Sequence, residues 1–308
     1  MHKCNLCSSK RVKYFTKIKN YKFFRCGKCN TLQLKYSKFK PTYSAKFKYL
    51  IDRPSKRRII KNSKDILYYI KKKNYRGNTL LDIGSGFGYF LNEASKAYKY
   101  TLGLEPSQNL YKFSSKKLKV NVLNKSFQNY LKNSKYQKFD VITMIHVIEH
   151  VKNPKKFIKK ALTLLNNDGI LFIETPNLDS WLFDVEQKKY TFLTPPEHTY
   201  ILSLDSFKEI LKTDLNSKIT KIATYSYTEH AVKIIKELFT LNISKNTEIE
   251  RKPVAVFIDD RPAKRLVNEI KKSIFYIIFH KILGPIILPF LKLYYKGTFL
   301  RLYIKKIA

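Results

Sequence analysis

The sequence predicts an α/β fold in which helices cover both faces of a mostly parallel sheet. From Thr79 onward, short apolar runs typical of buried strands alternate with amphipathic stretches typical of helices. This alternation favours parallel strands joined by crossover helices. The first of these strands also runs into a glycine-rich loop within Leu80–Phe90, where Leu81–Phe90 reads LDIGSGFGYF. Such loops lie at the carboxyl edge of open parallel sheets, which supports the same fold class.

Length and composition set the limits of this prediction. The 308 residues suffice for one sizeable core plus a small accessory domain, and 44% of them are hydrophobic. The formal net charge of +38 would suit a nucleic acid or an anionic membrane as partner. However, the lysines are spread along the whole chain among many Asn, Ile, Tyr and Phe residues, as an AT-rich coding bias would also produce. The first ten residues lack an apolar stretch, so we expect a cytoplasmic protein, with the inner membrane surface as an alternative location.

Residues 1–35 carry two CxxC pairs, Cys4–Cys7 and Cys26–Cys29, with eighteen residues between the inner cysteines. This spacing is typical of a structural Zn²⁺ site in which four thiolates form a tetrahedron. Apolar residues between the pairs suit the β-hairpin of a zinc ribbon. Residues 36–76 are expected to form a linker and then a packing helix around Ile59–Ile70.

Residues 77–260 are expected to form the main domain. Its strands are predicted at Thr79–Ile83, Tyr100–Leu104, Val120–Leu123, Val141–Ile145 and Ile170–Ile173, with closing antiparallel strands at Lys218–Thr224 and Pro253–Ile258. Its helices are predicted at Tyr89–Ala97, Leu110–Lys117, Pro154–Leu165 and Ser206–Leu211. Asn153 is a suitable N-cap for the third of these helices, and Pro154 suits its first position.

Residues 261–308 differ in character and are expected to form an apolar, basic helical tail. Their apolar segments, Ile274–Phe279 and Ile282–Leu291, are interrupted by charged residues, glycine and proline. Neither segment approaches the roughly 18 to 20 apolar residues that span a bilayer. The tail could lie in a membrane interface, cover the sheet or form a homodimer contact.

The glycine-rich loop has features that identify its ligand. Gly84, Gly86 and Gly88 allow the backbone to turn sharply and approach a ligand closely. The third glycine comes one residue too early for the G-x-G-x-x-G pattern of dinucleotide folds. Asp82, just before the loop, suits an ammonium group better than a pyrophosphate. Glu105 ends the next strand, where a carboxylate can accept hydrogen bonds from both ribose hydroxyls.

Together, the segments LDIGSGFGYF, GLEPS, FDVITMIHVIEHVKNP and DGILFIETPN resemble the class I, Rossmann-like S-adenosylmethionine-dependent methyltransferases. The resemblance covers about Leu80–Leu211 and implies a seven-stranded sheet. It also implies residues that bind the donor: the glycine loop with Asp82 at the methionine part, Glu105 at the ribose, and Ser126 and Phe127 beside the adenine. His146, directly after the fourth strand, joins this cofactor-binding set.

Two histidines are candidates for the proton transfer that accompanies methylation, because imidazole titrates near neutral pH. His150 follows the fourth strand at the carboxyl edge, and His198 lies in a loop after the fifth strand. The alternative for each is a purely structural hydrogen bond. Glu197 and His198 also resemble the Glu-His pair of deoxysugar C-methyltransferases, which likewise carry an N-terminal zinc domain. This resemblance adds Glu197 to the two histidines, so the predicted catalytic residues are Glu197, His198 and His150.

The expected function is therefore methylation of a small molecule, a sugar or glycan precursor, at oxygen or carbon. One alternative is a lipid or quinone methyltransferase at the membrane surface, suggested by the apolar tail. Another is a nucleic-acid methyltransferase, which is disfavoured because His146–Glu149 stands where amino-methylating enzymes need Asn/Asp-Pro-Pro-Tyr. A binding module without activity is disfavoured because the glycine and acidic positions are intact.

Overall fold

The computed structural model describes residues 3–35, 53–72, 77–132, 137–212, 216–227, 229–231, 233–234 and 295–307. The chain divides into two compact units. The larger unit comprises Met1–Leu178, Thr191–Ala223 and Leu300–Ala308, and the smaller unit comprises Asp179–Tyr190 and Thr224–Phe299. Every candidate site residue predicted above belongs to the larger unit.

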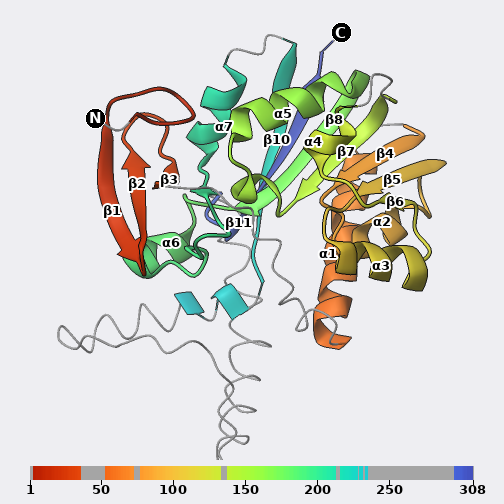
Figure 1. Cartoon of the computed structure of the whole chain (residues 1–308), viewed down its shortest axis with the longest axis horizontal. Coiled ribbons are helices and arrows are strands. Elements are labelled where there is room, and N and C mark those ends of the chain that lie inside the picture. The colour runs from red at the N-terminus through yellow and green to blue at the C-terminus, as the bar shows by residue number, and fades with distance from the viewer. Residues whose placement is uncertain are drawn as a thin grey trace, which may run out of the picture. The chain divides into compact units, whose positions relative to one another are not determined.

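The fold is built on a seven-stranded sheet with the strand order β10-β11-β8-β7-β4-β5-β6, as Figure 1 shows. Strands β4 to β8 pair in parallel, which confirms the predicted fold class. Because Ile83 is paired with both Leu104 and Met144, the carboxyl ends of these strands meet at one edge. The five strands are β4 (Thr79–Ile83), β5 (Tyr100–Leu104), β6 (Val122–Leu123), β7 (Phe139–Ile145) and β8 (Leu165–Pro176).

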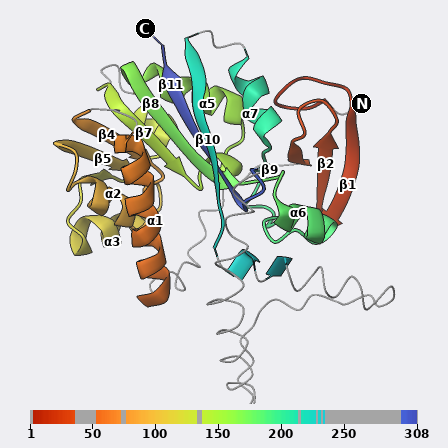
Figure 2. The ribbon, with the colours of Figure 1, turned by 180° about the vertical axis from the view of Figure 1, so that it is seen from behind.

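Helices cover both faces of the sheet (Figures 1 and 2). One face carries α1 (Arg53–Lys72), α2 (Tyr89–Ala94) and α3 (Gln108–Lys117), and the other carries α4 (Phe127–Tyr130), α5 (Pro154–Thr163) and α7 (Leu204–Leu211). Alternate strand residues supply the two cores. Leu80 and Val141 pack with the α1 side chains, whereas Leu81 and Ile142 pack with those of α5 and α7.

Local sequence signals explain where the helices begin. The side chain of Asn153 accepts the backbone N–H of Lys156, and Pro154 occupies the first turn of α5, as predicted. The side chains of Ser203 and Ser206 form a reciprocal capping box at the start of α7. These caps fix two helices that flank the carboxyl edge.

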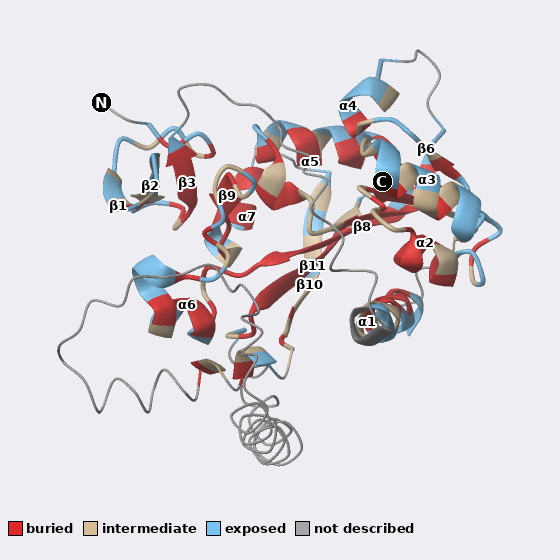
Figure 3. Cartoon of the chain, turned by 60° about the horizontal axis from the view of Figure 1, so that its bottom comes forward, coloured by how far each residue is buried: buried red, intermediate tan, exposed pale blue. Residues whose placement is uncertain are grey.

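The strands β10 (Ser217–Tyr225) and β11 (Phe299–Lys306) complete the sheet. They are antiparallel, since the Ile307 N–H donates to the Asn216 carbonyl and the Thr220 hydroxyl donates to the Tyr303 carbonyl. The prediction of a helical tail is therefore wrong for residues 299–306. Their first six residues are all buried (Figure 3), and a run of apolar residues interrupted only by Arg301 suits a strand covered on both faces.

Several expectations fall outside the described residues. These are the closing strand at residues 253–258, the apolar segments 274–279 and 282–291, and the membrane or dimer contacts that they suggested. Within the described part of the chain, no helix is long and apolar enough to cross a membrane.

The N-terminal segment forms a small sheet of its own. Strands β1 (Val12–Ile18), β2 (Tyr21–Cys26) and β3 (Leu32–Lys35) pair in antiparallel order, as a ribbon requires. Strand β3 also pairs with β9 (Tyr200–Ile201), which follows the His198 loop directly. The ribbon is thus joined through main-chain hydrogen bonds to the loop that carries a predicted catalytic residue.

The smaller unit contains the short helix α6 (Trp181–Glu186), which is capped by the side chain of Ser180. The Lys296 ammonium lies 2.8 Å from the Asp184 carboxylate. Tyr227 packs edge-on against Phe299, with ring centroids 5.5 Å apart.

Candidate active site

The glycine-rich loop turns the chain sharply between β4 and α2. Gly84, Gly86 and Gly88 have φ values of 75°, 56° and 77°, a region that only glycine adopts without strain. A Cβ on Gly84 would lie 2.6 Å from a methyl group of Val147, and one on Gly88 would lie 2.8 Å from the Cβ of Ser114. These two glycines are therefore needed for packing as well as for the turn.

The third loop glycine faces open space. A Cβ built on Gly86 meets no described atom within 4 Å. Beside it, the buried hydroxyl of Ser85 has no hydrogen-bond partner within the described ranges. Room next to glycine and an unsatisfied polar atom are what a cradle for a polar ligand provides. The loop therefore fits the donor that its sequence predicts.

The two acids assigned to the donor lie on neighbouring strands at this edge. Asp82 is buried and accepts the Thr143 hydroxyl at 2.7 Å. Burial is the main cause that raises the pKa of Asp82 to about 7, and the nearby charge of Glu105 adds to it. Glu105 accepts the N–H groups of Gly86 and Ser107, at 2.8 and 2.7 Å, so its carboxylate also shapes the loop.

Ser126 and Phe127 lie at the start of α4, after β6. The Ser126 hydroxyl caps this helix by accepting the Asn129 N–H. The Phe127 ring is buried against Phe157 of α5, with ring centroids 4.8 Å apart. These contacts give both side chains a structural role, and their proposed place beside the adenine stays a prediction.

His146 follows β7 and has a left-handed backbone conformation with φ 54°. Its Nδ1 lies 3.3 Å from a Glu149 oxygen, and its Nε2 lies 3.4 Å from a Glu174 oxygen. Burial opposes the charged form, but the hydrogen bonds to both carboxylates outweigh it and raise the pKa of His146 to about 10. These two carboxylates favour the protonated ring, which does not suit a general base.

The other two histidines come together, although 48 residues separate them in the chain. The rings of His150 and His198 are edge-to-face, with centroids 4.8 Å apart. Potential ligand or proton-carrying atoms of Glu149, His150 and His198 all lie within 4.8 Å of one another. The structure thus assembles a small acid–base cluster at the carboxyl edge.

Each of these two rings has its Nδ1 anchored to a backbone carbonyl. His198 Nδ1 lies 2.7 Å from the Phe192 oxygen, and His150 Nδ1 lies 2.9 Å from the Glu197 oxygen. Because a carbonyl only accepts, Nδ1 carries the proton and Nε2 is the basic nitrogen in the neutral ring. Burial lowers the pKa of His198 to about 4, so this ring is neutral at physiological pH.

Glu197 takes part in this arrangement through its backbone. Its carbonyl holds His150, while its side chain is exposed. The neighbouring Thr199 ties the loop down, because its N–H and its hydroxyl both donate to the Glu149 carbonyl, at 2.8 and 3.0 Å. The predicted catalytic role of the Glu197 carboxylate remains untested by these contacts.

The four cysteines gather at one end of the ribbon. The sulfur atoms of Cys4 and Cys29 lie 3.5 Å apart, and those of Cys7 and Cys26 lie 3.6 Å apart. A tetrahedron with Zn–S bonds of about 2.3 Å has sulfur atoms about 3.8 Å apart, so the thiols are arranged as a Zn²⁺ site requires. The Ser203 and Ser206 hydroxyls of α7 both donate to the Cys29 carbonyl, which fastens this end of the ribbon.

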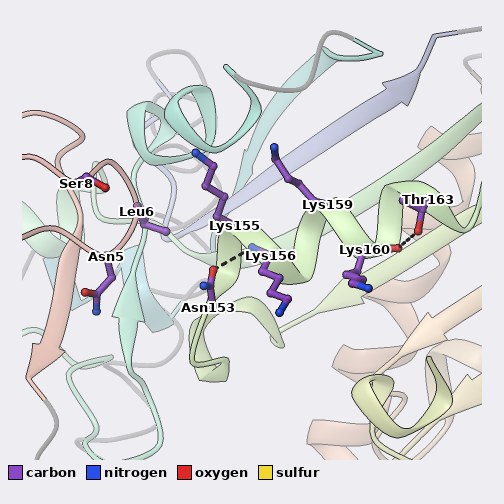
Figure 4. Close-up of a pocket in the computed structure, with 9 residues that line it drawn as sticks. All are labelled: Asn5, Leu6, Ser8, Asn153, Lys155, Lys156, Lys159, Lys160 and Thr163. Carbon is purple, nitrogen blue, oxygen red and sulfur yellow. Dashed lines mark hydrogen bonds between the residues drawn. The ribbon is translucent and has the colours of Figure 1, made fainter. Parts of the chain in front are cut away.

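A cavity of about 440 Å³ lies on the outer side of α5, as Figure 4 shows. Four of its nine lining residues are lysines, and none is a predicted donor-binding or catalytic residue. Its lining residues are Asn5, Leu6, Ser8, Asn153, Lys155, Lys156, Lys159, Lys160 and Thr163. The cavity is therefore distinct from the candidate active site.

Sequence reasoning missed three polar residues behind the edge. Thr143 holds Asp82, and Glu174 and Arg301 form a buried ion pair. Glu174 ends an apolar run, which was the signal that identified Glu105 as a functional acid. Arg301 lies in the segment that was expected to be a helical tail, so nothing in its neighbourhood indicated a partner on β8.

Comparisons with known proteins identify the family to which the chain belongs. The profile of a family described as "Methyltransferase domain" matches residues 53–214, which is more than half of the chain. The ubiquinone biosynthesis O-methyltransferase of Pelagibacter ubique is 32% identical over 169 residues, which cover 53% of this chain and 68% of that protein. A protein of the same name from Coxiella burnetii is 27% identical over 140 residues, and the matched part spans about 60% of its length.

Among solved structures, a SAM-dependent methyltransferase from Archaeoglobus fulgidus has a TM-score of 0.48 and 22% identity, covering 82% of this chain and 94% of that one. The plantazolicin methyltransferase BamL has a TM-score of 0.49 and 16% identity, covering 83% and 87% of the two chains.

Proposed function

The chain belongs to the methyltransferase-domain family, and from this premise we propose that it transfers the methyl group of S-adenosylmethionine to a hydroxyl oxygen of a small molecule. The observation that carries this proposal is the His198 ring, held with Nε2 as its basic nitrogen, beside His150 and Glu149 at the carboxyl edge. When bound, S-adenosylmethionine supplies a methyl group that its sulfonium makes electrophilic. A hydroxyl acceptor needs a base, because it must lose its proton during transfer, and the His198 ring can supply one.

Different residues of the chain hold the donor and remove the proton from the acceptor. The glycine loop, Asp82 and Glu105 hold the donor at the ends of β4 and β5. His198 takes the hydroxyl proton on Nε2, while Phe192 keeps the ring oriented through Nδ1. The new oxygen–carbon bond then forms as the carbon–sulfur bond breaks, and the proton leaves on the imidazole. Orienting the acceptor oxygen in line with the methyl group supplies most of the remaining rate gain.

A second part of the proposal concerns the ribbon. Its four thiolates hold a structural Zn²⁺, and the metal supports the acceptor side of the site through β3 and β9. The Leu34 N–H donates to the Thr199 carbonyl at 2.9 Å, one residue from His198. The Asn5 amide donates to the Tyr200 hydroxyl, which donates to the Lys152 carbonyl. The ribbon thus fastens both loops that carry the catalytic histidines.

Two classes of acceptor are supported by different observations. The Glu197–His198 segment and the N-terminal zinc domain favour a sugar or glycan precursor. The relatives named ubiquinone biosynthesis O-methyltransferases favour a phenolic hydroxyl on a quinone precursor. We place the sugar first, because the zinc ribbon and the His198 loop are one structural unit here.

Incubation with isotopically labelled donor tests the proposal. A small-molecule extract and total RNA are offered in parallel, and mass spectrometry identifies the labelled product and its methylated atom. The expected result is a labelled O-methyl group on a small carbohydrate. A labelled phenolic ether would replace the sugar by the quinone-type acceptor, and label found only in RNA would contradict a small-molecule function.

A further inference from the structure

The last strand of the sheet places a buried arginine behind the active site. Arg301 of β11 is 4% exposed, and its Nε donates to a Glu174 oxygen at 2.5 Å. Another nitrogen of the guanidinium donates to the Asn62 side-chain oxygen of α1, and the Asn62 amide donates to the second Glu174 oxygen at 3.1 Å. Two segments that are far from β8 in the chain, α1 and β11, therefore fix the Glu174 carboxylate in a single orientation.

The fixed carboxylate reaches the catalytic edge through His146. The second Glu174 oxygen lies 3.4 Å from His146 Nε2, and Glu149 faces Nδ1 at 3.3 Å. The remaining Glu149 oxygen accepts the Thr175 hydroxyl. Ionised carboxylates only accept hydrogen bonds, so a ring placed between two of them is satisfied when both of its nitrogens carry protons. The geometry therefore favours the protonated form of His146, the imidazolium.

Arg301, Glu174, His146 and Glu149 form a charge row, in which positive and negative side chains alternate and the charges sum to zero. Arg301 and His146 are positive, Glu174 and Glu149 are negative, and both carboxylates are fully buried. A buried charge is tolerated only when it is paired and hydrogen-bonded, which each member of the row achieves. The last member, Glu149, lies within 4.8 Å of His150 and His198. The charge of His146 therefore offsets that of Glu149 next to the proposed base.

We propose that Glu174, with Arg301 as its counter-ion, is a positioning residue for methyl transfer, because it holds His146 as a fixed cation between itself and Glu149. This inference rests on the proposed function of the same edge. Neither residue touches the acceptor. Their effect passes through His146 to the charge that His198 experiences.

The variant Glu174→Gln tests the inference. Losing the Glu174 carboxylate leaves an excess positive charge among these side chains, so the His146 ring loses its proton more readily as the pH rises. The ring titration of His146, followed by NMR in histidine-labelled protein, is expected to fall from about 10 by at least about one unit. His146 still carries its proton at the acid limb near pH 4, so the loss of the Glu174 charge disfavours protonation of His198, and the acid limb of the kcat profile moves to lower pH.

A matched control lies on the same pair of strands. Asp168 of β8 is exposed and pairs with Lys305 of β11 at 2.7 Å. Asp168→Asn makes the same acid-to-amide change and is expected to leave both titrations in place. If the single variant does not fold, the buried Arg301 has been left without a counter-ion. In that case the double variant Glu174→Gln with Arg301→Met removes both charges. Glu174 faces the His146 ring directly at 3.4 Å, whereas Arg301 binds the other Glu174 oxygen, so the expected shift of the His146 titration keeps its direction.

Three results would overturn the inference. One is a wild-type His146 that titrates near the usual 6.5, and another is an unchanged titration in a folded Glu174 variant. The third is an equal shift in Asp168→Asn. The NMR titration needs no turnover, so a protein that transfers no methyl group would refute the proposed function and still leave the charge row testable.

Discussion

The donor side and the acceptor side of the carboxyl edge are built in different ways. The donor side uses one continuous stretch, in which β4, the glycine loop and β5 carry Asp82, Gly86 and Glu105 within 24 residues. The acceptor side combines His150 after β7, His198 before β9, and a ribbon from the first 35 residues. The first is determined by local backbone geometry, whereas the second depends on contacts between distant segments. Substitutions on the donor side and on the acceptor side should therefore affect different measured properties.

The largest effect is expected from His198→Ala. Removing the proposed base should lower kcat about 1000-fold, within the usual range for general-base catalysis. Steady-state kinetics with labelled donor measures this loss. A variant that keeps more than a tenth of the wild-type kcat would contradict the assignment of His198 as the base.

A smaller loss is expected when the ribbon loses its metal. Cys26→Ser should release β3 from its fixed position and so loosen the β9 pairing that holds the His198 loop. A displacement of 1 Å at the reacting group costs about 100-fold in turnover. Metal content by mass spectrometry and kcat are measured together. Full activity in a zinc-free variant would show that the ribbon does not support the site.

On the donor side, Gly86→Ala should weaken binding without unfolding the domain. Its Cβ meets no described protein atom, so alanine adds backbone strain of about 1 kcal/mol at this positive φ, and a steric clash arises only with a bound ligand. We expect the donor Kd to rise about tenfold, equivalent to about 1.4 kcal/mol, by calorimetric titration.

Gly27→Ala serves as the control for this glycine. Gly27 has no positive φ, and its nearest neighbour would lie at an ordinary 3.5 Å. Equal donor affinities in the two variants would mean that the open space beside Gly86 is not the donor site.

The pH profile gives a further contrast. Burial lowers the folded-state pKa of His198 to about 4, so the basic form persists as the pH falls below the usual value of 6.5. Accordingly kcat should remain nearly constant from pH 7 to pH 5 and decline only as the pH approaches 4. Loss of half the activity near pH 6.5 would indicate an unshifted histidine as the base.

The smallest effect is expected from Glu197→Gln. The structure uses the backbone carbonyl of this residue, which the substitution leaves in place, and the side chain is exposed. We expect kcat to change by less than about threefold, as for other surface substitutions. A loss of kcat comparable to that of His198→Ala would show that the Glu197 carboxylate takes part in catalysis.

The same contrast explains how much the sequence could predict. The strands at Thr79–Ile83 and Tyr100–Leu104 were predicted to the residue, because glycines and short apolar runs mark them locally. The proximity of His150 to His198 was not predictable, since it depends on how the chain returns after β8. Arg301 was missed for a related reason. An arginine within an apolar run gives no sign of its partner, and Phe299–Lys306 becomes a strand only because β8 and β10 lie on either side of it.

The separation of the two sides is tested most directly by titrating S-adenosylmethionine into His198→Ala in parallel with the wild-type protein. If donor binding is independent of His198, the Kd values of the variant and the wild-type protein agree within about twofold, the range of ordinary surface substitutions. The variant has nevertheless lost turnover. A Kd that rises in proportion to the loss of kcat would contradict the account, because His198 would then belong to the donor site.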